Sequence, residues 1–313
     1  MLVKFWGVRG SLPSPLVSDK VAGKFFEIFE KLCPSDLESP DSKKRFLKEL
    51  PSRLYGTVGG NTACVSVQLK DSHEVLVLDA GSGIREMGIS FGNLDPKLTR
   101  YHILFSHFHW DHLMGLPFFA PAYDPSVTLD FYSPFSGIEK TLNDQMMPPY
   151  FPIQMETMAS KKNFHTISGP LELLGAKISY RKMNHPGDSF SYKVEYEAKK
   201  FIYATDTELL PEDFLKTDEN SAFFSGADLI VVDSQYTIGE AIEKYNWGHN
   251  SYSMAVDFAA NWGIKHLVLF HHDPGYDDEM LFSILQSARS YTERMNIKGI
   301  NISLAIEGTE ITL

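Results

Sequence analysis

The chain has 313 residues, of which 43% are hydrophobic and 22% charged, and its formal net charge is −11. This composition is typical of a folded globular protein and excludes a disordered chain, and the negative charge argues against broad, non-specific attraction to nucleic-acid backbones. The chain has two cysteines, Cys33 and Cys64, and no CxxC motif, so it predicts neither a disulfide framework nor a thiolate metal site.

The N-terminal residues lack a basic region followed by an apolar core, and no apolar run approaches the ~18 residues that a membrane helix needs. We therefore expect a cytoplasmic protein with no membrane partner.

The first part of the chain predicts a strand, a loop and a helical insertion. Residues 2–6 form an apolar strand closed by Gly7, and residues 8–15 form a loop rich in glycine, proline and serine. Between residues 18 and 50 the apolar positions recur at helical spacing, which indicates a helical insertion with a lid as one candidate role. The apolar residues on that helical face are Val21, Phe25, Phe26 and Phe29.

The rest of the chain alternates between strands and a few helices. Strands are predicted at residues 64–69, 74–78, 102–105, 127–132, 177–183, 189–196, 200–204, 228–232 and 265–270, with a closing hairpin of 301–306 and 310–313. Helices are predicted at residues 137–145, 251–262 and 277–295, the second ending at Gly263. Residues 146–164 fit neither pattern and are interpreted as an irregular insertion. Because no linker or repeat interrupts this order, we predict one αββα domain over residues 1–313.

The sequence SHFHWDH, residues 106–112, follows the apolar strand at 102–105. Side chains two residues apart on an extended segment point to the same side, so His107 and His109 can share one metal ion. The chain then turns and can direct Asp111 and His112 toward a second ion. The alternative is a polar loop with hydrogen-bonded histidines, but imidazole and carboxylate at this density are typical zinc-type ligands.

Three more candidate ligands, His185, Asp206 and His271, follow predicted strands, where α/β folds place functional residues. Any one of them alone could be a hydrogen-bonded structural residue. Together with the motif at 106–112 they are of the right chemical types to complete a two-metal site.

Asp79, the motif at 106–112, His185, Asp206 and His271 each follow a predicted strand. This series of residues resembles the metallo-β-lactamase superfamily over nearly the whole chain. More narrowly, GVRGSLPSP, GGNTACV and the HNS of WGHNSYS resemble the phosphodiesterase branch that includes ribonuclease Z and phosphoribosyl cyclic phosphodiesterase. The resemblance implies a four-layer αββα sandwich, a single domain with helical insertions at 18–50 and an irregular one at 146–164.

The resemblance also implies how the ligands are shared between two divalent ions, with zinc expected first and manganese or iron as alternatives. One ion takes His107, His109 and His185, the second takes Asp111, His112 and His271, and Asp206 bridges both. His271 is preferred to the adjacent His272 because it directly follows the strand. Asp79 corresponds to a residue that orients a ligand histidine, although a turn-forming aspartate before glycine would give the same sequence.

The same resemblance suggests residues that act on the substrate. His249 is the candidate proton donor to a leaving alkoxide, and Asp233 is the acidic partner that holds it protonated. Ribonuclease Z carries glutamate where this chain has Asp233. The alternative interpretation of His249 is a residue near a helix start that only packs. Asn61 and Arg9 are candidate phosphate contacts, with a turn and a surface position as alternatives.

We therefore predict a di-metal hydrolase in which a bridging hydroxide attacks phosphorus, with Asp111, His249 and Asp233 as catalytic residues. The expected substrate is a small cyclic or nucleotide-like phosphodiester, and no extensive nucleic-acid binding is expected. The alternatives are a thioester or lactone hydrolase on the same site and a non-catalytic metal-binding scaffold. Composition and motifs leave the oligomeric state open.

Overall fold

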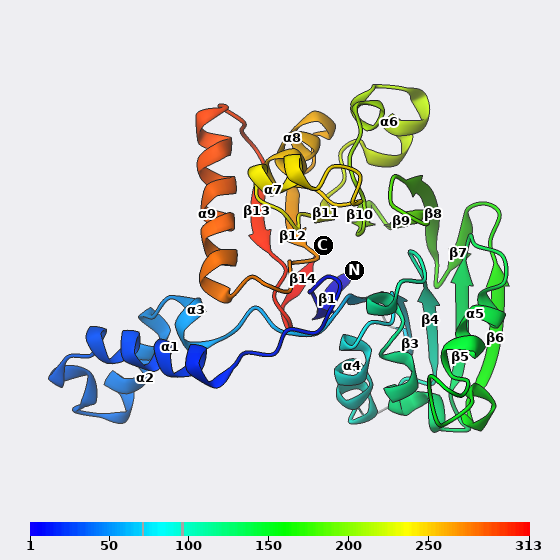
Figure 1. The fold of residues 1–313 in the computed structure, drawn as a ribbon, viewed down its shortest axis with the longest axis horizontal. Coiled ribbons are helices and arrows are strands. Elements are labelled where there is room, and N and C mark those ends of the chain that lie inside the picture. Colours follow the sequence, from blue (N-terminus) through cyan, green and yellow to red (C-terminus); the bar gives the residue numbers. More distant parts are fainter. Residues whose placement is uncertain (71, 95–96) are drawn as a thin grey trace.

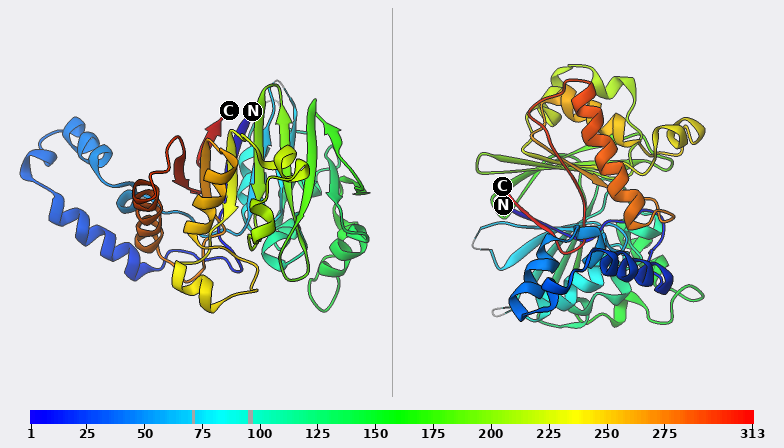
Figure 2. Two further views of the ribbon diagram at one scale, coloured as in Figure 1. Left: turned by 90° about the horizontal axis from the view of Figure 1, so that it is seen from above. Right: turned by 90° about the vertical axis from the view of Figure 1, so that its left-hand side faces the viewer.

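The computed structural model describes residues 1–70, 72–94 and 97–313, and the strands in these residues form two seven-stranded sheets. The sheets pack face to face with helices on their outer sides, as Figure 1 and the right-hand view of Figure 2 show. This arrangement is the predicted αββα sandwich.

The first sheet has the strand order β14-β1-β2-β3-β4-β5-β6. The pairs from β14 to β3 are antiparallel, and those from β3 to β6 are parallel. The strands are β1 (Leu2–Gly7), β2 (Cys64–Gln68), β3 (Glu74–Leu78), β4 (Arg100–Leu104), β5 (Thr128–Ser133), β6 (Lys161–Thr166) and β14 (Glu310–Thr312).

The second sheet has the order β13-β12-β11-β10-β9-β8-β7. Its pairs from β13 to β10 are parallel, and those from β10 to β7 are antiparallel. Strands β8, β10, β11 and β12 therefore run in one direction, and their carboxyl ends meet at one edge. The strands are β7 (Leu171–Leu173), β8 (Ala176–Met183), β9 (Ser189–Tyr196), β10 (Lys199–Ala204), β11 (Leu229–Asp233), β12 (His266–Phe270) and β13 (Asn301–Leu304).

The predicted closing hairpin is wrong. β13 pairs with β12 in the second sheet, whereas β14 crosses to the first sheet and pairs with β1. Strand patterning finds a strand but cannot identify its partner, because the pairing of β14 with β1 is a contact between the two ends of the chain. The segment 146–164 is likewise only partly irregular, since β6 begins at Lys161 and pairs with β5.

Helices cover the outer faces of both sheets. Apolar side chains of α4 pack on the first sheet, and those of α8 and α9 pack on the second. The helices are α1 (Ser18–Lys31), α2 (Pro40–Glu49), α3 (Ser52–Tyr55), α4 (Gly83–Gly92), α5 (Ile138–Gln145), α6 (Asp218–Phe224), α7 (Ile238–Glu243), α8 (Tyr252–Trp262) and α9 (Asp278–Arg294). Short 3₁₀ turns lie at Pro34–Leu37, Trp110–His112, Leu116–Phe118, Ala120–Tyr123, Met155–Thr157 and Pro211–Phe214. Within the described residues, the helices are all too short or too polar to cross a membrane.

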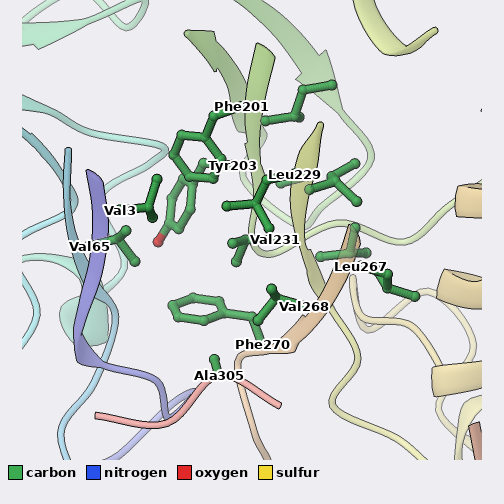
Figure 3. Packing of buried hydrophobic residues seen from close by; sticks show 14 of the residues in the cluster. Val3, Val65, Phe201, Tyr203, Leu229, Val231, Leu267, Val268, Phe270 and Ala305 are labelled. Atoms are coloured by element: carbon green, nitrogen blue, oxygen red, sulfur yellow. The ribbon is translucent and has the colours of Figure 1, made fainter. Parts of the chain in front are cut away.

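The core between the sheets is built from the inward-facing side chains of both. Val3 and Val65 of the first sheet face Phe201 and Tyr203 of the second across this layer (Figure 3). All five residues of β11 are buried, because sheet packs on one side of the strand and helices on the other. The tightly packed layer fixes the two sheets relative to each other, and so fixes the edge at which their strand ends meet.

The predicted helical insertion forms an arm that projects from the body, as Figure 1 and the left-hand view of Figure 2 show. Helix α1 has no buried residue, and Phe25, Phe26 and Phe29 are more than half exposed. Ion pairs hold the arm to α9: Lys20 Nζ lies 2.6 Å from Asp277 Oδ2, and Lys24 pairs with Asp278. The apolar face that predicted the helix therefore does not pack on the core.

Candidate metal centre

The predicted ligands meet where strand ends of the two sheets approach each other. Four of them lie in the segment after β4 in the first sheet, and the others follow β8, β10 and β12 in the second. Parallel strands bring side chains that are distant in the sequence to one edge. The seven side chains fall into two groups in which every donor atom lies within 4.8 Å of the others.

The first group contains His107, His109, His185 and Asp206. Nδ1 of His109 lies 3.2 Å from Nε2 of His185. Oδ1 of Asp206 lies 3.8 Å from Nε2 of His107 and 3.7 Å from Nε2 of His185. Three imidazole nitrogens and one carboxylate oxygen thus surround one point.

The second group contains Asp111, His112, His271 and again Asp206. Oδ2 of Asp206 lies 2.9 Å from Nε2 of His112 and 3.0 Å from Nε2 of His271. Nε2 of His271 is also 3.2 Å from Oδ2 of Asp111. Because Asp206 turns one oxygen to each group, it has the geometry of a bridging carboxylate.

Hydrogen bonds to the far side of each ring orient the ligand histidines. Nδ1 of His112 donates to Oδ2 of Asp79 over 2.8 Å, and Nδ1 of His185 donates to the carbonyl of Gly248 over 3.0 Å. Nδ1 of His107 lies 3.0 Å from the hydroxyl of Ser106. These contacts place the proton on Nδ1 and leave the Nε2 lone pair facing the centre, as metal ligation requires.

Asp79 is itself held by three further donors. The backbone N–H and hydroxyl of Ser106 donate to it over 2.7 Å each, and the hydroxyl of Tyr203 donates over 2.9 Å. A turn-forming aspartate would not need this network, so the contacts favour the orienting role over the turn.

The charges and vacant lone pairs of these residues fit a cation. Burial lowers the pKa of His107 and His185, so both rings are neutral and can donate a lone pair. Among the described residues, Nε2 of His107 and of His112 has no hydrogen-bond partner although it is buried. Buried nitrogens of this kind are costly unless something satisfies them, and a divalent ion would do so.

The backbone at the centre is strained in a way that serves this geometry. Asp79, Asp206 and His271 have φ values of 60°, 46° and 59°, a region that non-glycine residues rarely adopt. Two glycines allow the ligands to approach: a Cβ on Gly10 would lie 2.4 Å from Cε1 of His271, and one on Gly248 would lie 2.2 Å from Nδ1 of His185. Side chains are therefore excluded at both positions.

His249 and Asp233 form a pair beside the centre. Nδ1 of His249 donates to Oδ2 of Asp233 over 2.6 Å, and Asp233 is fully buried at the end of β11. Burial by itself would lower the pKa of His249, but the Asp233 carboxylate opposes it and raises that pKa to about 9. The Nδ1 contact leaves Nε2 available to a molecule in the pocket, which His249 helps to line.

The pocket over the centre has a volume of about 540 Å³. Its lining residues are Ser11, Phe108, His109, Trp110, Asp111, His185, Pro186, Asp206, Trp247, His249 and His271. The backbone N–H of Ser11 donates to Oδ2 of Asp111 over 2.8 Å. Sequence reasoning did not assign Ser11 or Tyr203 a role. Ser11 lies in the glycine-rich loop that could have drawn attention to it, whereas nothing in the sequence around Tyr203 points to Asp79.

Both predicted phosphate contacts, Arg9 and Asn61, lie outside the pocket lining. The Arg9 guanidinium is buried and donates to the carbonyls of Gly59, Asp273 and Tyr276. Asn61 donates to Glu307 and accepts from Ser82, and neither Asn61 nor Arg9 is among the described residues that line the pocket. The structure thus uses both side chains to hold loops together, because their polar groups are already paired.

The choice between His271 and His272 is made by the same geometry. His271 reaches both Asp111 and Asp206, whereas Nε2 of His272 donates to the carbonyl of Ala305 over 2.9 Å. Consecutive residues at a strand end point to opposite sides, so only one of the two can face the centre.

Comparison with known proteins places this centre in a family. Residues 76–272 match the family model described as beta-lactamase superfamily domain. Ribonuclease Z of Oceanobacillus iheyensis is 21% identical over 281 residues, which cover 73% of this chain and 89% of that one. The metallo-β-lactamase fold protein YhfI of Bacillus subtilis superposes with a TM-score of 0.64 at 16% identity, covering 99% of this chain and 98% of the other. The short form of human tRNase Z superposes with a TM-score of 0.63 at 16% identity, covering 100% and 99%.

These findings correct the predicted partner. A small-molecule substrate with no extensive nucleic-acid binding was expected from the net charge of −11, but relatives that cover most of this chain are named ribonuclease Z. The inference failed because net charge is a sum over the whole surface, whereas a phosphate is recognised by the charge at one pocket. Cations at the two ligand groups would add positive charge at the pocket, and the net charge calculated from the sequence does not include it.

Proposed function

The chain belongs to the beta-lactamase superfamily, and we propose that it is a metal-dependent phosphodiesterase that cleaves RNA. The observation that carries the proposal is the pair of ligand groups that share Asp206, with the His249–Asp233 pair at the rim of the same pocket. Relatives named ribonuclease Z support the choice of RNA, and hydrolysis is the class of reaction that the predicted site and these relatives have in common.

The donors suit two divalent ions, and we propose zinc. Imidazole and carboxylate ligands fit Zn²⁺, with Mn²⁺ and Fe²⁺ as the ions that a metal analysis must distinguish from it. When bound, two such ions lower the pKa of a water molecule and neutralise the oxygens of a phosphodiester. Against the two carboxylates of Asp111 and Asp206, two dications would leave two positive charges at the pocket. This local excess would attract a phosphate despite the acidic surface.

The protein groups in the pocket have two further roles, which are to hold the ligand groups in place and to donate a proton. Asp206 and Asp111 hold the two ligand groups in register, and the N–H of Ser11 fixes the Asp111 carboxylate. Hydrolysis of RNA leaves an alkoxide, which is a poor leaving group and needs a proton. His249 supplies it from Nε2 in this proposal, because Asp233 keeps the ring protonated at neutral pH.

The second enzyme class, hydrolysis of a thioester or lactone, would make little use of this donor. Those leaving groups depart with less help from an acid than an alkoxide does. The close His249–Asp233 pair therefore favours the phosphodiester.

Purified protein loaded with zinc should be tested on a panel of structured and single-stranded RNAs, tRNA included, and in parallel on carboxyl esters and thioesters. We expect specific RNA cleavage that is lost in Asp206→Asn, with metal content measured for both proteins. Turnover of esters by the loaded protein with no RNA cleavage would overturn the proposal. A protein that binds two ions and turns over neither class would favour the scaffold.

A further inference from the structure

A second cavity of about 530 Å³ lies beside the metal pocket. The two share Phe108 and Trp110 as a common wall. The other residues of this second cavity are Leu113, Met114, Pro117, Phe118, Thr141, Asp144, Gln145, Tyr150 and Phe151. We refer to it as the aromatic cavity, because five of its lining side chains are Phe, Trp or Tyr.

Aromatic rings at its mouth are open to solvent. Trp110 is 77% exposed and Tyr150 is 78% exposed, although large aromatic side chains are usually well buried. Phe118 and Phe151, which also line the cavity, meet edge to face with ring centroids 5.6 Å apart. Exposed flat rings next to a cavity are suited to stacking on a flat ligand.

One polar group in the lining lacks a partner. Nε2 of Gln145, at the end of α5, donates to the carbonyl of Leu113 over 3.0 Å, which fixes the orientation of the carboxamide. Oε1 of the same side chain is buried and accepts no hydrogen bond from the described residues. A buried acceptor without a donor is costly, so a ligand amino group that reached Oε1 from the cavity would relieve it.

Trp110 connects this cavity to the ions. It lies between His109 and Asp111 in the chain, on the 3₁₀ turn Trp110–His112, and so touches both spaces. A phosphodiester seated at the ligand groups would have its neighbouring nucleotide within reach of the aromatic cavity.

We propose that the aromatic cavity binds an unpaired nucleobase next to the scissile phosphate, stacked on Trp110 and Tyr150, with its exocyclic amino group donating to Oε1 of Gln145. The proposal rests on the proposed function, because it assumes a phosphodiester at the metal centre. Single-stranded RNA is recognised in this way elsewhere, by stacking on aromatic side chains combined with hydrogen bonds to base edges.

Binding of nucleotides separates this proposal from RNA cleavage. Calorimetric titration of the zinc-loaded protein should give at least about fivefold tighter binding of cytidine monophosphate than of ribose 5-phosphate, since stacking contributes this much per base. Trp110→Ala and Tyr150→Ala should each bring the ratio close to one. Phe26→Ala, an equally exposed aromatic on the arm, should leave it unchanged.

Gln145→Leu tests the amino group. The wild type should bind cytidine monophosphate more tightly than uridine monophosphate, which has a carbonyl in place of the amino group, and the variant should lose this preference. Metal content is measured for every variant, and Tyr150→Ala carries the test if Trp110→Ala loses an ion.

Equal binding of cytidine monophosphate and ribose 5-phosphate by the wild type would overturn the nucleobase site even if RNA were cleaved. Nucleobase preference that survives both aromatic substitutions would overturn it as well. Conversely, a preference that depends on Trp110 and Tyr150 in a protein that cleaves no RNA would contradict the proposed function and leave the site supported.

Discussion

Replacing Asp233 with Asn tests whether a buried carboxylate keeps the proposed proton donor charged. Oδ2 of Asp233 accepts from Nδ1 of His249 over 2.6 Å, and the asparagine oxygen can accept the same hydrogen bond at the cost of the longer bonds that Oδ1 accepts from the backbone N–H groups of Gln235 and Asn250. The ring should therefore keep its orientation while the negative charge is lost. Burial is then opposed only by the carboxylates of Asp206 and Asp111, so the pKa of His249 should fall from about 9 toward its ordinary value.

The size of the effect follows from the fraction of His249 that carries the proton. A raised pKa means that the proton is present at neutral pH and is lost as the pH rises through about 9. At about pH 8 a group with that pKa is roughly nine-tenths protonated, whereas at the ordinary value of about 6.5 only about 3% is. We therefore expect RNA cleavage by Asp233→Asn to be about 30-fold slower at that pH. Bound cations would lower the pKa of His249 in both proteins, so the separation between their alkaline limbs is the quantity to compare.

The assay is the pH profile of kcat on two substrates of the same nucleotide, one an RNA linkage and one a p-nitrophenyl ester. The alkoxide of RNA needs the proton, but p-nitrophenolate does not, so the loss should be confined to RNA. Equal losses on both substrates would refute the donor role and give Asp233 a structural one. An unchanged alkaline limb on RNA would refute the coupling between Asp233 and His249.

Three further changes probe the centre and the fold. Gly248→Ala would place a Cβ 2.2 Å from Nδ1 of His185, so metal analysis should find one ion per chain in place of two, with an unchanged circular dichroism spectrum. Each tenfold rise in free zinc above the Kd should stabilise the wild type by about 1.4 kcal/mol per bound ion, or about 2.8 kcal/mol for two ions, in thermal unfolding, and Asp206→Ala should weaken this dependence; equal slopes would contradict the shared-ligand assignment. Burial would raise the pKa of Asp130, but its hydrogen bond from Arg100 lowers it to about 2, so this contribution to stability is present at neutral pH and lost as the pH falls from about 4 to about 2. Asp130→Asn should remove about 2 kcal/mol at neutral pH and flatten that acid limb in urea unfolding.

The residues of the two candidate ligand groups could be picked out from the sequence because their signal is local. The motif at 106–112 places four ligands in one segment, and the others each follow an apolar strand whose end is easy to locate. The sequence pattern could not predict how the side chains at the centre are oriented. The two oxygens of Asp206 that face different groups, and the hydroxyl of Tyr203 that reaches Asp79, depend on contacts between the two sheets.

The failures have the same origin. Arg9 has the right chemistry for a phosphate, but backbone carbonyls distant in the sequence accept hydrogen bonds from its Nε and Nη1. β14 was recognised as a strand, yet its partner β1 lies at the other end of the chain. The arm of α1 and α2 was found as helix, but its apolar face lies in solvent, which helical periodicity alone does not reveal.

The division of the ligands between two sheets gives the centre a mechanical role. His107 and His109 extend from the first sheet, and His185 and Asp206 from the second, so neither half of the sandwich can complete a coordination sphere by itself. An ion bound there would cross-link segments on the order of 80 to 160 residues apart, and closing long loops restricts the unfolded chain most. Cys33 and Cys64 are free, so this chain has no disulfide to do the same. Bound ions would then join the two halves of the sandwich reversibly, and metal occupancy would indicate whether the halves are joined.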